Sequence, residues 1–436
     1  MKRGISVIKQ KIKDKQIKVA VVGLGYVGLP LALEFAKRGL SVIGIEIDKH
    51  RVNQLRKRTS YITDVTSQEL KAVCAKHDFV VLTDYKGIEK ADAVIICVPT
   101  PLKRKYHPDI SYIKKAVRGI SRHINKGTLV VLESTTYPGT TEEVILPLLE
   151  HKGFKHNRDF YLCFSPERID PGNLDYPVHK IPKVVGGLTP EATQLGVLLY
   201  KNIIEKVVPV SSARVAEVVK LLENTFRLVN IGLIDELAMM AHKMKVDIWE
   251  VISAASTKPF GFMPFLPGPG VGGHCIPKDP LYLYWKARHH GFKSRFIKLA
   301  SGIVSSMPEY VVDRMQEELK HRGIVPDKAK ILLMGVTYKK DVLDLRKSPA
   351  LDIIEILARH KVAVSYYDPL VPYLSINQID LKSIKLSARV LRQFDCILIC
   401  AAHTSVNYSF ILKNSQMIFD TRNVYKRSRD AKIYRL

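Results

Sequence analysis

Apolar runs that alternate with amphipathic segments fill the first half of the chain. Residues 17–23, IKVAVVG, predict a buried strand, residues 29–39, LPLALEFAKRG, an amphipathic helix, and residues 41–48, SVIGIEID, a second strand. Further strands are predicted at 91–99, 127–134, 160–166 and 183–187. Strands that alternate with helices are typical of a parallel sheet with helices on both faces. Residues 1–16 predict a short helix or a loose arm ahead of it.

The pattern changes at Ser211. Residues 211–245 contain almost no helix breaker except Gly232, and their apolar positions run nearly all round a helix. We therefore predict one long helix that is buried on several sides. It is long enough to join two domains and to bury its apolar excess against a second copy of the chain, so a homodimer or higher homo-oligomer is expected. Two further helices are predicted at 281–291 and 296–323.

Strand and helix patterns alternate again from Ala329 onward. Strands are predicted at 329–339, 363–369, 395–402 and 416–423, with a helix at 348–361. The predicted fold class is therefore α/β, with two Rossmann-like doubly wound domains joined by the long central helix and a helical connector. We place the domains at residues 1–210, 211–320 and 321–436.

A glycine motif, GLGYVG, occupies residues 23–28, directly after the first predicted strand and at the start of the first long helix. In that context GxGxxG predicts a dinucleotide site. Gly23 permits the tight turn, Gly25 lets pyrophosphate approach the backbone, and Gly28 allows close packing of helix on strand. Glu46, at the end of the second strand, would bind the ribose hydroxyls, and because a carboxylate repels a 2′-phosphate, NAD is favoured over NADP. Asp48 shares this role or takes it.

Composition and charge narrow the function further. The six cysteines form no CxxC pair, which is typical of a reduced cytoplasmic protein and argues against structural disulfides or a zinc site. The net charge of +26 favours anionic substrates. The basic residues form no nucleic-acid-binding motif, so no nucleic-acid partner is expected. The uncharged run at 19–33 is shorter than the roughly 20 residues of a membrane-spanning helix, so we expect no membrane segment.

Cys275 lies in a loop of unusual composition, GPGVGGHCIPKDP at 268–280. Glycine and proline at this density exclude a regular helix or strand. Free backbone N–H groups and nearby cations such as Lys278 favour a thiolate. A nucleophilic thiol beside a nicotinamide site suggests capture of an aldehyde as a thiohemiacetal, oxidation to a thioester and release of an acid by water. The other five cysteines are expected to be small buried side chains.

Eight separate motifs, in order along the chain, resemble those of the UDP-glucose/GDP-mannose dehydrogenase family. They are GLGYVGLP, ICVPTP (96–101), ESTTYPGTTEE (133–143), SPERIDPGN (165–173), EVVKLLENTFR (217–227), the Cys275 loop, TYKKDVLDLRKSPAL (337–351) and DTRN (420–423). The basic N-terminal arm, His274 and YLYWKAR (282–288) resemble most the members that act on UDP-N-acetylglucosamine. The resemblance implies oxidation of the C6 hydroxyl of a UDP-sugar to a uronic acid with two NAD.

The resemblance also implies roles for individual residues. The catalytic residues would be Cys275, Lys220, Asn224, Asp279, Glu167 and Thr135. NAD would be bound by the glycine motif with Tyr26 and Val27, by Glu46 and Asp48, and by Arg51, Pro99, Thr100, Thr135 and Arg346. The UDP-sugar would contact Glu167, Arg168, Lys220, Asn224, Gly272, Lys339 and Arg422. No metal is implied.

Several of these roles have a structural alternative. Lys220 and Asn224 lie four residues apart and would hold the sugar C6 oxygen from one helix face; the structural alternative for Lys220 is a surface lysine. Asp279 would orient a water or act as a base, and an Asp paired with a Lys fits as well. Glu167 and Thr135 would serve thioester hydrolysis or only cap a turn. Glu46 stands where the family usually has aspartate.

Two other classes of function remain open at this point. A NAD-dependent epimerase or dehydratase would recycle its NAD and leave the thiol without a role. A nucleic-acid-binding protein is suggested by the charge alone. Within the dehydrogenases, UDP-N-acetylmannosamine and UDP-glucose are the alternative substrates.

Overall fold

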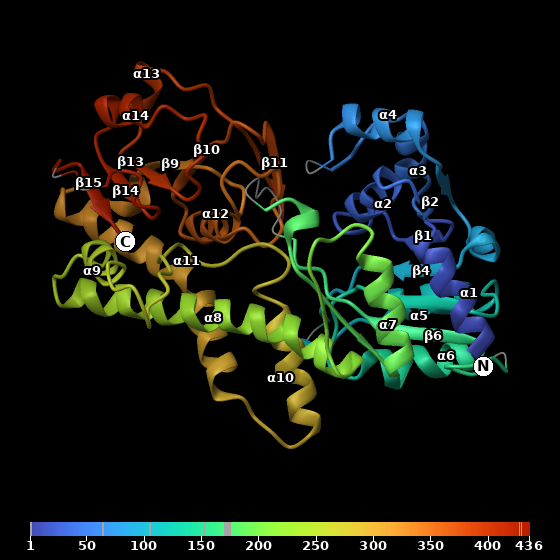
Figure 1. Cartoon of the computed structure of the whole chain (residues 1–436). Helices are drawn as coiled ribbons and strands as arrows, with labels where there is room; N and C mark the ends of the chain where they lie inside the picture. The colour runs from blue at the N-terminus through green and yellow to red at the C-terminus, as the bar shows by residue number, and fades with distance from the viewer. Residues whose placement is uncertain are drawn as a thin grey trace. The chain divides into compact units, whose positions relative to one another are not determined.

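The computed structural model describes residues 2–436 except 63–64, 104–105, 152, 170–175, 427 and 429, and it leaves out the side chains of residues 2–4. The chain divides into two compact units. The first consists of Met1–Glu223 and Leu281–Phe292, and the second of Asn224–Pro280 and Lys293–Leu436. Each unit is built on its own β-sheet (Figure 1). The two sheets confirm the α/β class with two Rossmann-like folds.

The first unit contains an eight-stranded sheet in the order β3-β2-β1-β4-β5-β6-β7-β8. The strands are β1 (Lys18–Val22), β2 (Ser41–Ile45), β3 (Phe79–Leu82), β4 (Ala93–Ile96), β5 (Thr128–Leu132), β6 (Phe160–Phe164), β7 (Lys183–Gly187) and β8 (Val207–Pro209). The order 3-2-1-4-5-6 is that of a dinucleotide-binding Rossmann sheet. The predicted parallel sheet has one antiparallel pair, because β7 runs antiparallel to β6.

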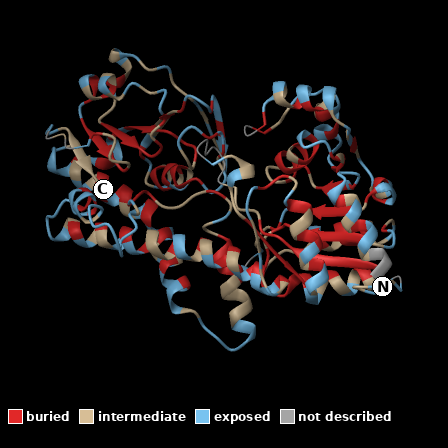
Figure 2. Ribbon diagram, viewed as in Figure 1, coloured by how far each residue is buried: buried red, intermediate tan, exposed pale blue. Residues whose placement is uncertain are grey.

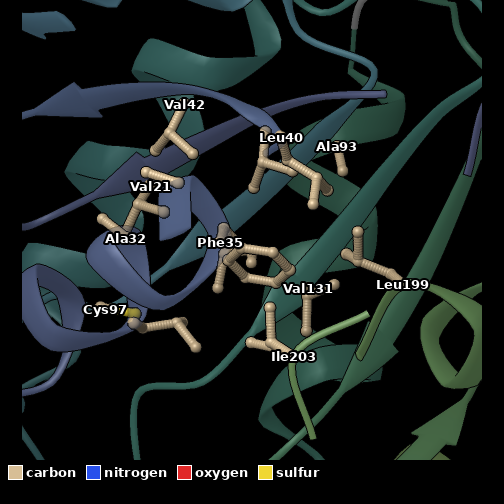
Figure 3. Packing of buried hydrophobic residues seen from close by; sticks show 14 of the residues in the cluster. Val21, Ala32, Phe35, Leu40, Val42, Ala93, Cys97, Val131, Leu199 and Ile203 are labelled. Atoms are coloured by element: carbon tan, nitrogen blue, oxygen red, sulfur yellow. The ribbon is translucent and has the colours of Figure 1, made fainter. Parts of the chain in front are cut away.

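Alternate side chains of the strands enter two separate cores, one on each face of this sheet. Val19 and Val21 face one core, and Ala20 and Val22 the other. The first core is covered by α1 (Lys2–Lys13), α2 (Gly28–Lys37), α3 (Lys49–Arg56), α4 (Ser67–Lys76) and α7 (Pro190–Tyr200). The second is covered by η1 (Tyr85–Lys90), α5 (Ser111–Ser121), η3 (Thr141–Ile145), α6 (Leu146–Glu150) and the start of α8 (Ala213–Lys243). Figure 3 shows Phe35 of α2 packed among strand side chains of the first core.

The second unit contains a five-stranded parallel sheet in the order β10-β9-β13-β14-β15. Its strands are β9 (Lys330–Met334), β10 (Ala363–Tyr367), β13 (Cys396–Ile399), β14 (Ile418–Asp420) and β15 (Ile433–Arg435), beside a hairpin of β11 (Tyr373–Ile376) and β12 (Ile379–Lys382). One face packs on α11 (Arg295–His321) and α12 (Pro349–Arg359), and the other on α13 (Ala388–Leu391) and α14 (Tyr408–Asn414). The central strands of both sheets are buried (Figure 2).

The long helix predicted across Gly232 is α8 (Ala213–Lys243). Gly232 does not interrupt it, and a Cβ atom there would lie 3.0 Å from the Cα and Cβ atoms of Ala300 on α11, so this glycine allows two helices to cross closely. The predicted burial on several sides is incomplete, because a row of apolar side chains on α8 is exposed within this chain. The remaining elements are η4 (Val178–Lys180), α9 (Ile248–Ala255), α10 (Asp279–His289) and η5 (Pro326–Lys328). The three-domain boundaries stay a prediction.

Candidate active site

The glycine motif forms the turn between β1 and α2. Gly23 has a φ of +90°, and a Cβ on Gly28 would lie 1.9 Å from the Gly23 carbonyl oxygen, so neither position accepts a side chain. A Cβ on Gly25 would meet nothing within 4 Å, so the backbone there faces open space. Tyr26 and Val27 complete the turn before α2, and the N-terminus of a helix favours an anion. The arrangement fits a dinucleotide pyrophosphate.

Glu46 follows β2 and turns its carboxylate toward this motif. One oxygen, Oε2, accepts a hydrogen bond from Leu24 N at 3.2 Å, and the other, Oε1, accepts from Asp48 N at 3.0 Å. Asp48 is not on the strand as predicted but caps α3, where it accepts hydrogen bonds from His50 N and Arg51 N. Glu46 is therefore the acid beside the glycine motif, where a ribose would lie.

Arg51 and Tyr61 border the same region. Arg51 Nη1 lies 3.8 Å from Glu46 Oε2, and its guanidinium lies over the ring of Tyr61. The Tyr61 hydroxyl donates to the Leu24 carbonyl at 2.5 Å. Burial, helped by the Glu46 charge, raises the pKa of Tyr61. Tyr61 had no predicted role, yet it ties a distant loop to the glycine motif.

The ends of β4 and β5 are joined through Thr100. Its hydroxyl donates to the Thr135 carbonyl at 2.7 Å, and the Tyr282 hydroxyl of α10 donates to the Thr100 carbonyl. Pro99 and Thr100 follow β4, and Thr135 follows β5, so all three lie at the carboxyl edge of the sheet, where ligands bind in Rossmann folds. Thr135 is partly exposed, whereas Thr100 is buried.

Glu167, at the end of β6, belongs to a buried ionic cluster. Its Oε1 accepts hydrogen bonds at 2.6 Å from the backbone N–H groups of Arg168 and Ile169, and its Oε2 lies 3.3 Å from Lys183 Nζ. Burial alone would raise the pKa of Glu167, but Lys183 and these N–H groups bring it below its ordinary value. Lys220 of α8 lowers that pKa further.

Lys220 of α8 is buried, and its positive charge interacts with the Glu167 carboxylate. The alternative that Lys220 is a surface lysine was therefore wrong. Arg168 has protein partners for its guanidinium. It donates to the Pro182 carbonyl at 2.6 Å, and its Nη2 lies 2.7 Å from Glu223 Oε1. In this arrangement Arg168 ties the loop after β6 to α8.

In the second unit, Cys275 lies in the predicted irregular loop immediately before α10. It is exposed, whereas Cys97, Cys163, Cys396 and Cys400 are buried and Cys74 is partly buried. The Cys275 carbonyl accepts hydrogen bonds from Lys278 N at 3.1 Å and Asp279 N at 2.8 Å, which close the first turn before the helix. The thiol therefore stands at a helix N-terminus, where a thiolate is stabilised.

Lys278 and His274 flank the thiol. Lys278 Nζ lies 2.9 Å from His274 Nδ1. Burial, followed by the charges of Lys278 and Arg346, lowers the pKa of His274 to about 4, so the imidazole is neutral at pH 7 and accepts from the ammonium. Burial lowers the pKa of Lys278 to about 8, while Asp279 and Cys275 oppose that shift. The Lys278 charge thus interacts favourably with a Cys275 thiolate.

The glycines of this loop let it pass close to the segment after β9. A Cβ on Gly272 would lie 2.4 Å from the Cβ of Tyr338, and Gly273, with a φ of +82°, donates its N–H to the Arg346 carbonyl at 2.8 Å. Arg346 itself forms a two-pronged pair with Asp344, with Nε and Nη2 at 2.9 and 2.6 Å from Oδ2.

Asn224 and Asp279 form a buried pair. The Asn224 side-chain amide donates to Asp279 Oδ2 at 2.7 Å, and both residues are buried. This contact fixes the amide orientation of Asn224 and holds the start of α10 against α8. Asn224, Asp279 and Cys275 belong to the second unit, and Thr135, Glu167 and Lys220 to the first.

Lys339 and Arg422 lie at the carboxyl edge of the second sheet. A buried network shapes the turn that carries Lys339, because Asp368 Oδ2 accepts from Val336 N at 2.7 Å and lies 3.1 Å from His403 Nε2. Arg422 Nε donates to the Cys400 carbonyl at 2.7 Å.

Gly268 allows the Arg422 guanidinium to approach the Cys275 loop, since a Cβ there would lie 2.7 Å from Nη1. The N–H of Gly268 donates to buried Asp235 at 3.1 Å. Burial raises the pKa of Asp235 to about 7, and Arg422 acts against that shift.

Three family models match the chain. They describe the NAD binding domain, the central domain and the UDP binding domain of the UDP-glucose/GDP-mannose dehydrogenase family, and they match residues 17–204, 214–303 and 332–427. The chain belongs to the UDP-glucose/GDP-mannose dehydrogenase family. It is a NAD-binding dehydrogenase of that family, and the predicted cofactor is confirmed.

Similar proteins carry different substrate names. A UDP-N-acetyl-D-glucosamine 6-dehydrogenase of Pseudomonas aeruginosa is 42% identical over 81% of this chain and 83% of its own. A UDP-N-acetyl-D-mannosamine dehydrogenase of Pyrococcus horikoshii is 34% identical over 94% of this chain and 96% of its own. The solved structure of a UDP-D-ManNAc dehydrogenase from Pyrococcus horikoshii has a TM-score of 0.87 at 33% identity, covering 96% of this chain and 99% of that one.

Two residues of this family member escaped the sequence analysis, although each leaves a signal. Glu133 directly follows the apolar run of β5, and Lys183 opens the apolar run of β7. A charged residue at the edge of a buried strand indicates a buried ion pair.

Among the described residues, no group of metal-ligating side chains is found and no helix is long and apolar enough to cross a membrane. Residues 170–173 of the SPERIDPGN motif lie outside the described residues.

Proposed function

We propose that this dehydrogenase oxidises the C6 hydroxyl of UDP-N-acetylglucosamine to the carboxylate. The observation that carries the proposal is the exposed Cys275 thiol, which stands at the start of α10 beside a buried lysine while the other cysteines are buried or partly buried. The 42% identity to a UDP-N-acetyl-D-glucosamine 6-dehydrogenase favours that sugar. UDP-N-acetylmannosamine is the alternative, supported by the relative at 34% identity.

NAD would accept a hydride in each of two oxidations. Gly23, Gly25 and Gly28 would hold its pyrophosphate and Glu46 its ribose, and the open space at Gly25 fits this role. Tyr26, Val27, Arg51, Pro99, Thr100 and Thr135 would line the remainder of the cofactor site, with Arg346 near it. Asp48 remains the N-cap residue of α3 in this scheme.

The chain's own residues would carry the covalent steps. The Cys275 thiolate attacks the C6 aldehyde and forms a thiohemiacetal, whose oxidation leaves a thioester. Lys220 and Asn224 would stabilise negative charge on the C6 oxygen, and losing one such donor typically costs about 3–4 kcal/mol of transition-state stabilisation. Asp279 would hold the Asn224 amide in place through their hydrogen bond.

Hydrolysis of the thioester would fall to Glu167 and Thr135. A water, held by Thr135, attacks the carbonyl carbon while Glu167 takes its proton, and the C–S bond breaks to regenerate the thiolate. The lowered pKa of Glu167 keeps it ionised, as a base requires. Arg168 would support this loop through Glu223, and Gly272, Lys339 and Arg422 would contact the sugar and the uridine diphosphate.

The product would enter polysaccharide or glycoconjugate assembly. The free cysteines support a reducing, cytoplasmic location.

The deciding experiment measures initial NADH rates with a panel of UDP-sugars and the yield of NADH per sugar consumed. We expect the highest kcat/KM for UDP-N-acetylglucosamine, two NADH per sugar, and no acid from Cys275→Ala. A higher kcat/KM for UDP-N-acetylmannosamine would replace the substrate. The absence of net NADH would indicate an epimerase or dehydratase, and normal acid formation by Cys275→Ala would refute the thioester scheme.

A further inference from the structure

Lys183 lies between two carboxylates in the interior of the first unit. Its Nζ lies 2.9 Å from Glu133 Oε1 and 3.3 Å from Glu167 Oε2. The side chain of Lys183 is 5% exposed and that of Glu133 is 0% exposed. The Tyr200 hydroxyl also donates to Glu133 Oε1. One ammonium group therefore forms ion pairs with two carboxylates at a site where little water is present to stabilise their charges.

The two carboxylates have unequal surroundings. Glu133 Oε2 is buried and has no hydrogen-bond partner in the part of the chain that the structure describes, and burial raises the pKa of Glu133 to about 7. Glu167, by contrast, accepts two backbone N–H groups and also faces Lys220, so its pKa is lowered. The negative charge that Lys183 stabilises is therefore held chiefly on Glu167.

The groups around Lys183 come from several elements. Cys97 follows β4, Tyr200 is on α7 and Lys220 is on α8, and each interacts electrostatically with a member of the cluster. Beside Lys183 and Glu167 the structure has a cavity of about 10 Å³, with apolar walls that include Leu31 and Ile204. That volume is close to the minimum for one water molecule. Bulk water therefore cannot take over from the Lys183 ammonium in stabilising the Glu167 charge.

We propose that Lys183 is a positioning residue for thioester hydrolysis, because it keeps Glu167 ionised and fixes the carboxylate through Oε2. The inference rests on the proposed function. In the step concerned, the water oxygen bonds to the thioester carbon, the C–S bond breaks with its electron pair on Cys275 Sγ, and the water proton goes to Glu167. Lys183 touches neither substrate nor water in this scheme and acts only through Glu167.

The test compares Lys183→Met with Lys183→Arg in the full-length enzyme. Activity requires ionised Glu167, so activity is lost as the pH falls through the Glu167 pKa. Removing the Lys183 ammonium raises that pKa. We expect the acidic limb of the kcat profile to move up by at least about one pH unit, with kcat near that limb reduced about tenfold. KM for the UDP-sugar should change less than threefold, and Lys183→Arg should restore most of kcat.

A second readout isolates the hydrolytic step. Intact-protein mass spectrometry of acid-quenched turnover samples should show acyl-enzyme on Cys275 in Lys183→Met and little in the parent enzyme. Tyr200→Phe is the matched control, because it perturbs the same buried cluster without removing the cation. Its acidic limb should stay in place.

The outcomes separate the two proposals. If the parent enzyme makes no acid from UDP-sugars, the proposed function fails, and this inference fails with it. If the parent enzyme makes acid but Lys183→Met keeps the parent acidic limb and accumulates no acyl-enzyme, only this inference is overturned. Should Lys183→Met not fold, Glu133→Gln decides the question. In that variant Glu167 is the one carboxylate of the pair that remains beside Lys183. An acidic limb of the kcat profile that moves to higher pH would contradict the inference that Lys183 stabilises the negative charge of Glu167.

Discussion

Cys275 differs from the other cysteines of the chain in its exposure and in the lysine charge beside it. Its thiol is exposed beside Lys278, whereas Cys74 is partly buried and burial raises the pKa of Cys74. We expect iodoacetamide at neutral pH to label Cys275 first, as peptide mapping would show. Lys278→Met should slow that labelling by about three- to tenfold, because one pKa unit changes the thiolate fraction about tenfold.

Lys413→Met, which removes an exposed lysine on α14, provides the control for the loss of one positive charge. Equal labelling rates in Lys278→Met and Lys413→Met would mean that Lys278 does not support the thiolate.

Substitutions at two glycines of the dinucleotide turn should affect NAD binding and the stability of the fold separately. Gly25→Ala adds a Cβ into open space, so its free energy of unfolding should change by less than about 0.5 kcal/mol. Its KM for NAD should nevertheless rise about tenfold or more, a loss of about 1.4 kcal/mol, because the methyl group occupies the place of the pyrophosphate. Initial rates and urea unfolding measure the two quantities.

Gly28→Ala is the counterpart of that variant. Its Cβ would lie 1.9 Å from the Gly23 carbonyl oxygen, so the variant should lose about 1–3 kcal/mol of stability through overpacking. A destabilised Gly25→Ala with unchanged KM would refute the assignment of the open space to pyrophosphate.

At the scale of the elements, the longer strands and helices were predictable because their apolar runs are long. Five strands were not predicted, and each has only three or four residues: β3, β8, β11, β12 and β15. The antiparallel direction of β7 was missed as well, since strand direction depends on the path of the connecting segment and not on the local pattern.

The site was predictable to the extent that its residues directly follow strands or occupy named motifs. Cys275, Glu46 and Glu167 were predicted in this way. The partners of Lys183 were not, because Glu133 and Glu167 come from other strands and only the folded sheet brings the three side chains together. The capping role of Asp48 likewise depends on where α3 begins.

The crossing of α8 and α11 depends on one small residue. Gly232→Ala would place a Cβ 3.0 Å from Ala300, and overpacking of this kind costs about 1–3 kcal/mol. Alanine favours a helix over glycine by about 1 kcal/mol, which offsets part of that cost. We therefore expect a net loss of stability in urea unfolding.

Gly302→Ala on α11 is the matched control, because a Cβ there meets nothing within 4 Å. It should gain up to about 1 kcal/mol of stability from helix propensity alone. A Gly232→Ala variant as stable as Gly302→Ala would show that the two helices can separate without cost.

At the scale of the whole molecule, one surface of α8 is unusually apolar. Leu222, Phe226, Leu233 and Met240 recur at intervals of four and seven residues, which places them along one side of the helix, and Met244 follows directly after its end; each of these side chains is exposed. A row of exposed apolar side chains of this kind is typical of a protein–protein interface. We expect a second copy of the chain to cover it, since homodimers with a self-complementary patch are the commonest oligomers.

Sedimentation velocity tests this expectation directly. Leu233→Glu places a charge within the row and should convert a homo-oligomer into a monomer at micromolar concentration, because an unpaired charge buried in an apolar interface costs several kcal/mol. Val325→Glu substitutes an equally exposed apolar residue outside α8 and should leave the oligomer intact. A parent chain that sediments as a monomer would exclude the oligomer and leave the exposed row to another partner.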